Sequence, residues 1–219
     1  MKAIKISPTR LYLEFKTRKE MNLANFRITE FSEGKDGFKG VYFTYEEFID
    51  AYSDADGKMD YFSIWDGHNY SYKSVLEFYA MFKKFGFTSR EDKILRSLEE
   101  ITKDGYIICA VEGDDITLKH ETAHALFFES EEYRNEVIKI VSSLPKSIAK
   151  KFKDALLAMD YSDSVLIDEM HAYLVAYDKE EWALCFAKVK GKSIDSASCK
   201  LIALFEKHNN KTIVNESTI

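Results

Sequence analysis

Five residues near the middle of the chain, His120 to His124, have the order H-E-T-A-H. Two histidines four positions apart lie on one face of an α-helix, one turn from each other, so both imidazoles can bind the same Zn²⁺. Glu121 lies beside them and can take a proton from a water molecule that the metal activates, without being a ligand itself. The pattern therefore predicts a metal site suited to hydrolysis.

The surrounding sequence predicts the helix that these residues need. Residues 106–111 are typical of a short β-strand, and residues 112–115 are typical of a turn. Thr117 is the expected N-cap of the helix that follows. Apolar residues at 123 and 126–128 provide surface for burial. The two histidines are therefore expected on a half-buried helix that follows a strand.

This arrangement of strand, turn and helix resembles the zincin metallopeptidases, a class named after its zinc-binding helix. The resemblance covers residues from about 106 to 176. It implies an α+β fold, rich in helix, with a small β-sheet that precedes the active-site helix. It also implies a catalytic Zn²⁺ and a protein or peptide substrate.

The third metal ligand distinguishes the zincin subgroups. The metzincin pattern requires Gly and His at positions that Phe127 and Ser130 occupy here, and the thermolysin-like spacing would place a Glu at Ser143 or Leu144. The carboxylates at 131–132 share the expected helical face but lie about two turns, or roughly 10 Å, beyond the second histidine. That distance is too long for a zinc bond, so the third ligand must come from another segment.

Residues 165–176 predict a second helix whose face through Glu169 also carries Ala172 and Ala176. Small side chains allow close approach to the first helix, where Ala123 is the matching small residue. Glu169 would then point at the two histidines. The pattern D-E-x-x-A-Y-L is similar to the glutamate helix of the gluzincin class, although it lies further from the histidines than is common there. We therefore expect Glu169 to be the third ligand.

Other residues around Glu169 remain alternatives as ligands. His171 belongs to a common ligand type, but at two positions further along a helix it points about 200° away from Glu169. We interpret His171 as a surface histidine or one with a polar contact. Three aspartates are further alternatives: Asp160, Asp163 and Asp168. Tyr173 is either a hydroxyl donor to an oxyanion or a tyrosine packed at a helix interface.

We expect an N-terminal α+β portion, residues 1–104, and a zincin-like catalytic portion, residues 105–219, packed as one compact unit. In the first portion, sequence patterns predict strands at 11–15, 25–31 and 61–65, and helices at 44–52, 71–84 and 89–101. The loop that holds His68 and Tyr70 is a candidate rim of a substrate cleft. After residue 176, we expect helices at 179–189 and 194–207 and a frayed tail at 209–219.

The charge balance argues against nucleic-acid binding. The chain of 219 residues has 31 Lys and Arg against 37 Asp and Glu, a formal net charge of -6, whereas phosphate binding needs clustered basic residues. The one basic cluster, at 146–153, alternates with apolar residues and predicts the exposed face of an amphipathic helix. Three cysteines without CxxC spacing are interpreted as reduced core thiols. The sequence predicts no signal peptide or membrane span, so we expect a cytoplasmic protein without a membrane partner.

Together these patterns predict a zinc metallopeptidase of the HExxH type, similar to the gluzincins. His120, His124 and Glu169 are the expected Zn²⁺ ligands. Glu121 is the expected general base, and Tyr173 is the second expected catalytic residue. The alternative is a catalytically inactive, zincin-like interaction module that binds metal and is of viral or mobile-element origin.

Overall fold

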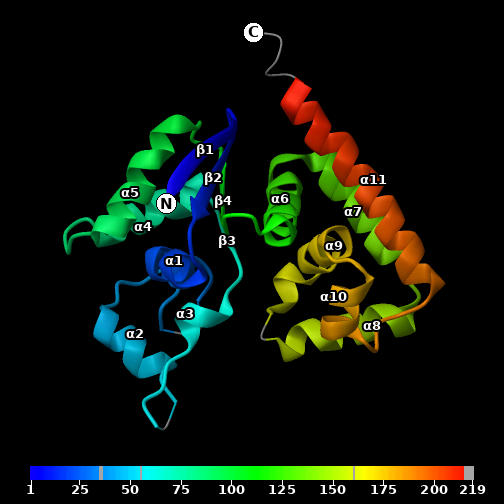
Figure 1. The fold of residues 1–219 in the computed structure, drawn as a ribbon, viewed down its shortest axis with the longest axis horizontal. Coiled ribbons are helices and arrows are strands. Elements are labelled where there is room, and N and C mark those ends of the chain that lie inside the picture. Colours follow the sequence, from blue (N-terminus) through cyan, green and yellow to red (C-terminus); the bar gives the residue numbers. More distant parts are fainter. Residues whose placement is uncertain (35–36, 55, 160, 215–219) are drawn as a thin grey trace. The chain divides into compact units, whose positions relative to one another are not determined.

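A computed structural model describes residues 1–34, 37–54, 56–159 and 161–214. It divides into two compact units, Met1–Asp114 and Asp115–Ile219. The first unit combines a four-stranded sheet with helices, and the described part of the second unit is helical (Figure 1). The chain therefore has the helix-rich α+β character, with a small sheet before the H-E-T-A-H helix, that the sequence predicts. The division falls about ten residues after the expected boundary at 104, because the strand at 106–111 belongs to the sheet of the first unit.

The sheet of the first unit contains β1 (Lys2–Ser7), β2 (Arg10–Phe15), β3 (His68–Ser71) and β4 (Tyr106–Val111), in the order β1-β2-β4-β3. β2 and β4 are parallel, and the two outer strands are antiparallel to their neighbours. β4 has the bounds predicted from its continuous apolar sequence, and its first five residues are buried. A strand buried on both faces has this composition.

The first unit also contains five α-helices and a 3₁₀ turn in its described part. These are α1 (Arg18–Glu33), α2 (Tyr45–Tyr52), α3 (Tyr61–Ile64), α4 (Tyr72–Phe82), α5 (Ser89–Ser97) and η1 (Leu98–Glu100). The predicted capping box of α2 is present, formed by Thr44 and Glu47. The strand predicted at 61–65 is wrong: this segment forms the short helix α3, in which Tyr61 packs into the core while Ile64 is exposed.

The strand predicted at 25–31 is also wrong, because these residues form the second half of α1. Their alternation of polar and apolar residues does not separate a buried face from an exposed one. Arg27 is buried in an ion pair with Glu91, in which its Nε lies 2.6 Å from Oε1. Glu30 is buried and accepts a hydrogen bond of 2.7 Å from the Tyr61 hydroxyl. Both polar and apolar side chains of α1 are therefore inside the unit.

His68 does not line a rim, contrary to the expectation from its loop-like sequence. It lies on β3 and is 5% exposed, and Tyr70 on the same strand is 3% exposed. The His68 Nε2 lies 2.6 Å from Asn22 Oδ1, and its Nδ1 lies 3.0 Å from Thr29 Oγ1. The Asn22 amide nitrogen donates to the carbonyls of Phe62 and Trp65, so its oxygen faces His68 and accepts the Nε2 proton. His68 is therefore a neutral core histidine.

Lowering the pH should destabilise the first unit through His68. Burial lowers the pKa of this ring to about 3, against about 6.5 in an unfolded chain. Below pH 6.5 the unfolded state binds a proton that the folded state does not bind. This contribution to stability is therefore complete above pH 6.5 and is lost as the pH falls toward 3. At pH 5 the expected loss is about 2 kcal/mol, because one pKa unit corresponds to about 1.36 kcal/mol.

Urea unfolding at pH 7 and at pH 5 measures this loss. The fluorescence of Trp65, in a Trp182→Phe background, reports on the first unit because the chain has only two tryptophans. His68→Gln removes the titrating ring, so the difference in unfolding free energy between the two pH values should shrink by about 2 kcal/mol. An equal pH dependence with and without His68 would contradict this assignment.

The described part of the second unit consists of six α-helices and a 3₁₀ turn. These are α6 (Asp115–Glu129), α7 (Glu131–Ser142), α8 (Lys146–Ala158), η2 (Asp163–Val165), α9 (Leu166–Ala176), α10 (Lys179–Phe186) and α11 (Lys192–Val214). α9 packs against α6, α7, α8 and α11, and in Figure 1 it lies next to α6 while α11 runs along α7. The central position of α9 places most of its side chains in the interior of this unit.

The helices of the second unit differ from the sequence-based expectations at the start of α6 and at the end of α11. α9 confirms the helix predicted at 165–176, but α6 begins at Asp115, so Thr117 lies inside the helix and is not its N-cap. The tail predicted at 209–219 is wrong for 209–214, which are helical, and the remaining residues lie outside the described part. The lysines of α8 are exposed on an amphipathic helix as predicted, with Phe152 and Leu156 fully buried.

Two further sequence-based expectations concern cysteines and membranes. All three cysteines are free thiols, but only Cys109 is buried, so Cys185 and Cys199 are not core thiols. Among the residues that the structure describes, no helix combines the length and the apolar character needed to cross a lipid bilayer.

Candidate metal centre

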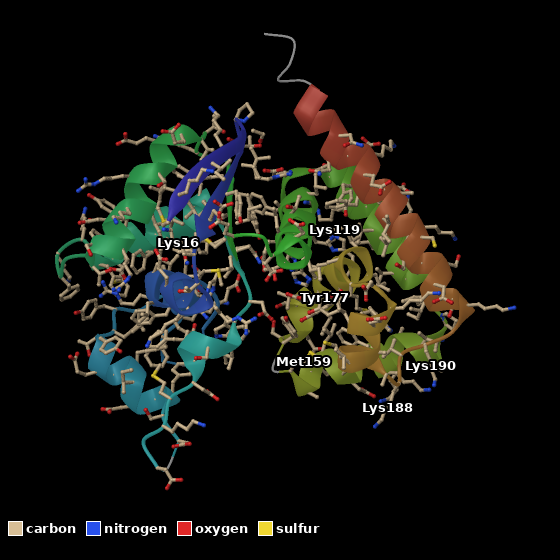
Figure 2. All side chains as sticks on the ribbon, viewed as in Figure 1. Lys16, Lys119, Met159, Tyr177, Lys188 and Lys190 are labelled. Carbon is tan, nitrogen blue, oxygen red and sulfur yellow. The ribbon has the colours of Figure 1, made fainter. Side chains whose placement is uncertain are left out.

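Two packed helices of the second unit bring the predicted metal ligands together. α6 carries His120 and His124, and α9 carries Glu169. These helices are in close contact. Ala123 on α6 and Ala172 on α9 are both 0% exposed, which agrees with the expectation that small residues allow close packing at this interface. The side chains that α6 and α9 contribute are drawn in Figure 2, where Lys119 marks α6.

The ligand atoms of His120, His124 and Glu169 face one another. The two histidine Nε2 atoms are 3.0 Å apart. Each lies 3.6 Å from one carboxylate oxygen of Glu169, with His120 near Oε2 and His124 near Oε1. A group with one atom from each side chain fits within 4.8 Å. Three ligands bonded to a tetrahedral ion at about 2.1 Å would be about 3.4 Å apart, so the 3.0 Å and 3.6 Å separations lie on either side of that spacing.

The burial of these groups supports a metal ion as their partner. The His124 side chain is 3% exposed, and those of His120 and Glu169 are each 12% exposed. Among the described residues, Glu169 Oε2 is buried without a hydrogen-bond partner. Buried polar atoms are nearly always paired, because an unpaired one loses its hydration without compensation. A cation between the rings would satisfy the carboxylate and both Nε2 atoms.

The carboxylate of Asp168 contacts the second ring nitrogen of His124. Its Oδ1 lies 2.9 Å from His124 Nδ1, while the Nε2 of this ring faces Glu169. Asp168 is therefore not part of the ligand group, although the sequence left it as an alternative ligand. A carboxylate on the second nitrogen of a metal-binding histidine fixes the tautomer and the orientation of the ring.

The contact between His124 and Asp168 also determines the charges of these two side chains when no ion is bound. Burial lowers the pKa of His124, but the negative charges of Asp168 and Glu169 outweigh it and raise the pKa to about 10. Burial raises the pKa of Asp168, but the neighbouring His124 outweighs it and holds the pKa well below its usual range. Metal binding at His124 Nε2 must therefore displace a proton.

His171 is a buried histidine with a polar contact, so the surface interpretation is wrong. It is 0% exposed. Its Nδ1 donates a hydrogen bond of 2.7 Å to the backbone carbonyl of Asp168 and lies 3.2 Å from the Asp168 carboxylate. The ring stacks on Phe127, with 5.3 Å between the ring centroids. It does not belong to the ligand group of His120, His124 and Glu169, and its polar contacts are to Asp168, whose carboxylate lies against His124 Nδ1.

Replacing Asp168 with asparagine should weaken zinc binding about 10- to 100-fold, which is the usual effect of losing a carboxylate that orients a metal-binding histidine. A competitive titration against a coloured chelator measures the change. Asp163→Asn is a matched control, because Asp163 is exposed and pairs with Lys153. Equal zinc affinities for the two variants would contradict the role assigned to Asp168.

Glu121 is next in sequence to His120 on α6, and Tyr173 packs against the His120 ring from α9. Glu121 is 6% exposed, and its negative charge raises the pKa of His124 and of Tyr173. The Tyr173 ring packs against His120, with 4.7 Å between the ring centroids, and its hydroxyl lies 2.9 Å from that of Tyr161. Burial and then the charge of Glu169 raise the pKa of Tyr161. Burial also raises the pKa of Tyr173, although the hydrogen bond with Tyr161 lowers it in part. Both hydroxyls therefore keep their protons at neutral pH.

The other acidic residues considered as metal ligands are Glu131, Glu132, Asp163 and Asp160. Glu131 and Glu132 do not continue the helix of His124, because α6 ends at Glu129 and the Ser130 hydroxyl caps α7. Glu132 lies 3.5 Å from Lys207 Nζ. Asp163, also considered as a ligand, is 72% exposed and pairs with Lys153. Asp160 lies outside the described residues.

Two residues of this centre were not predicted in their present roles. Asp168 was considered only as a ligand, and Tyr161 was not considered at all. The dipeptide Asp168-Glu169 is the pattern that indicates the first role, because adjacent positions on a helix point in different directions and can reach two sides of one histidine. No sequence pattern indicates the second role, since Tyr161 precedes α9 in an irregular segment.

Comparisons of the chain with protein-family models, with curated proteins and with solved structures find no match. The function proposed for this centre is therefore argued from its side chains and from their geometry.

Proposed function

We propose that the chain is a zinc-dependent metallopeptidase with a zincin-like, gluzincin-type arrangement of its active site. The observation that carries the proposal is the convergence of His120 Nε2, His124 Nε2 and a Glu169 oxygen within 4.8 Å, with Glu121 next in sequence to the first ligand. Two imidazoles and one carboxylate are the protein ligands of many catalytic zinc sites. Three ligands leave the fourth position of a tetrahedral ion for water or substrate.

The choice of zinc follows from the donor atoms. Two ring nitrogens and one carboxylate oxygen suit a borderline ion such as Zn²⁺ better than Mg²⁺ or Ca²⁺, which prefer sets of oxygen ligands. When bound, zinc supplies Lewis acidity and lowers the pKa of its water toward 7.

The protein side chains provide the proton transfers and the orientation. The carboxylate of Glu121 accepts a proton from the attacking water and then delivers it to the nitrogen of the leaving amine. The Tyr173 hydroxyl, which is protonated beside the His120 ring, donates a hydrogen bond to the oxygen of the scissile carbonyl as negative charge develops there. Asp168 holds His124 in the orientation that the ligand group requires.

The substrate class is a flexible protein or peptide, because a peptide carbonyl presents both an electrophilic carbon and an oxygen that gains negative charge. The chain has a net charge of -6, which does not favour a nucleic-acid substrate. A metal-binding interaction module without catalysis is the other outcome of the experiments below, and it would bind zinc without cleaving peptides.

Protein purified without a chelator should contain about one Zn²⁺ per chain, because two imidazoles and a carboxylate form a complete three-ligand site. Elemental analysis measures the content. The zinc should be lost as the pH falls, since protons compete for the imidazoles. A chain that contains no transition metal and takes up none from excess zinc would contradict the proposed function.

A further inference from the structure

Two tyrosine hydroxyls meet beside the ligand group. The Tyr161 Oη lies 2.9 Å from the Tyr173 Oη, and the two rings are nearly perpendicular, with an interplanar angle of 82°. Tyr173 comes from α9, one turn after Glu169, and its ring packs against His120. Tyr161 comes from the irregular segment between α8 and η2. A residue outside the helices therefore contacts the only tyrosine that the sequence indicates as a catalytic residue.

The position of Tyr161 is fixed by its own contacts. Its backbone N–H donates a hydrogen bond of 3.2 Å to the carbonyl of Leu156, at the end of α8. Its ring packs against the hydrophobic core of the second unit, as does the ring of Tyr173. Tyr161 therefore shares the surroundings of Tyr173, although it follows α8 and not α9.

The hydrogen bond between the two hydroxyls limits what each can donate. Each tyrosine has one proton, and one of the two protons is used in the bond between them. One proton therefore remains for another acceptor. A hydroxyl that accepts a hydrogen bond becomes a better donor itself, because the two bonds polarise one another. Tyr173 packs directly on a ligand ring, so it is the better placed of the two to donate onward.

We propose that Tyr161 is a positioning residue that donates its hydroxyl proton to Tyr173 Oη and so directs the Tyr173 proton toward the oxygen of the scissile carbonyl. The inference rests on the proposed peptidase function. When water attacks the carbonyl carbon, a C–O bond forms and the π electron pair moves onto the carbonyl oxygen. Tyr173 stabilises this charge by a hydrogen bond, and neither tyrosine transfers its proton. Without Tyr161, the Tyr173 hydroxyl is free to rotate.

A double-mutant cycle with Tyr161→Phe, Tyr173→Phe and the double variant tests this direction of action. On a quenched fluorescent peptide, Tyr173→Phe should lower kcat about 100-fold, as does the loss of one oxyanion donor, with KM nearly unchanged. Tyr161→Phe should lower kcat about tenfold, the usual value for one lost hydrogen bond. The double variant should be no slower than Tyr173→Phe, because Tyr161 acts through that hydroxyl. Zinc affinity should be the same in all four proteins.

Tyr177→Phe is the matched control, because the Tyr177 ring also packs on Tyr173, with 4.9 Å between centroids, and is labelled at the end of α9 in Figure 2. Its kcat should equal that of the wild type. Multiplying losses in the double variant would show that Tyr161 acts independently of Tyr173. An unchanged kcat in Tyr161→Phe would show that the hydrogen bond is only structural. Either result overturns the inference and leaves the peptidase function intact.

A binding measurement distinguishes failure of the inference about Tyr161 from failure of the proposed peptidase function. N-phosphorylated leucinamide presents a tetrahedral anion to the metal, whereas acetohydroxamate presents a planar one. The affinity for the tetrahedral probe should fall about tenfold in Tyr161→Phe and further in Tyr173→Phe, and the affinity for acetohydroxamate should not change. A zinc-loaded wild type that cleaves no peptide and binds neither probe would overturn both proposals, whereas normal cleavage with unchanged probe affinities in Tyr161→Phe would overturn this inference alone.

Discussion

Replacing Glu121 with glutamine should remove most of the peptidase activity and leave the zinc in place. Glutamine has the shape of glutamate, but its amide cannot accept the proton of the attacking water. We expect kcat to fall about 10²- to 10⁴-fold, which is the usual contribution of one general acid or base. Glu121 is buried next to the ligand group but is not one of its members, so the zinc content should remain that of the wild type.

The measurement is steady-state hydrolysis of a flexible protein, together with elemental analysis of each variant. Glu131→Gln is the matched control, because Glu131 is an exposed glutamate at the start of α7. It should have the activity of the wild type. Equal rates for Glu121→Gln and the wild type, both loaded with zinc, would show that another group transfers the proton.

Removing one of the proposed zinc ligands should greatly weaken zinc binding. Glu169→Ala and His124→Ala should each raise the Kd for zinc about a thousandfold or more. A protein zinc site provides roughly 12 kcal/mol of binding free energy, so each of three ligands contributes about 4 kcal/mol. That free energy corresponds to about a thousandfold in Kd. A competitive chelator titration measures the Kd, and circular dichroism establishes that each variant keeps its helices.

His171→Ala is the control variant, because it distinguishes Glu169 from His171 as the third ligand. His171 contacts Asp168 and does not belong to the ligand group. Its loss should weaken zinc binding about tenfold at most, because it is not a ligand and touches His124 only through Asp168 and through a ring contact with 6.2 Å between centroids. If His171→Ala were more damaging than Glu169→Ala, the ligand would be His171 and the comparison with the gluzincin class would fail.

The parts of this centre that depend on local spacing could be predicted from the sequence. Two histidines four positions apart must share a helical face, and their Nε2 atoms are in fact 3.0 Å apart. The approach of Glu169 to these histidines, 3.6 Å from each Nε2, could be predicted because its helical face carries small residues, one of which, Ala172, is fully buried. Both predictions start from the residues that share one helical face, which periodicity describes well.

The parts that depend on tertiary contacts could not be predicted. The alternation at 25–31 suggested a strand, but the polar side chains of this helix are buried with partners that come from distant segments, such as Glu91 for Arg27. The hydroxyl contact of Tyr161 likewise depends on how an irregular segment packs against α9. Periodicity identifies which residues share a face, and it does not identify what lies opposite that face.

Titrating zinc into the metal-free chain while following hydrolysis of a flexible protein tests the central claim most directly. Zinc at the group formed by His120, His124 and Glu169 should restore activity in proportion to the metal added, with saturation at about one equivalent per chain. Hydrolysis at the same rate without metal would contradict the account. A chain that binds one equivalent and cleaves nothing would also contradict it and would favour the inactive interaction module.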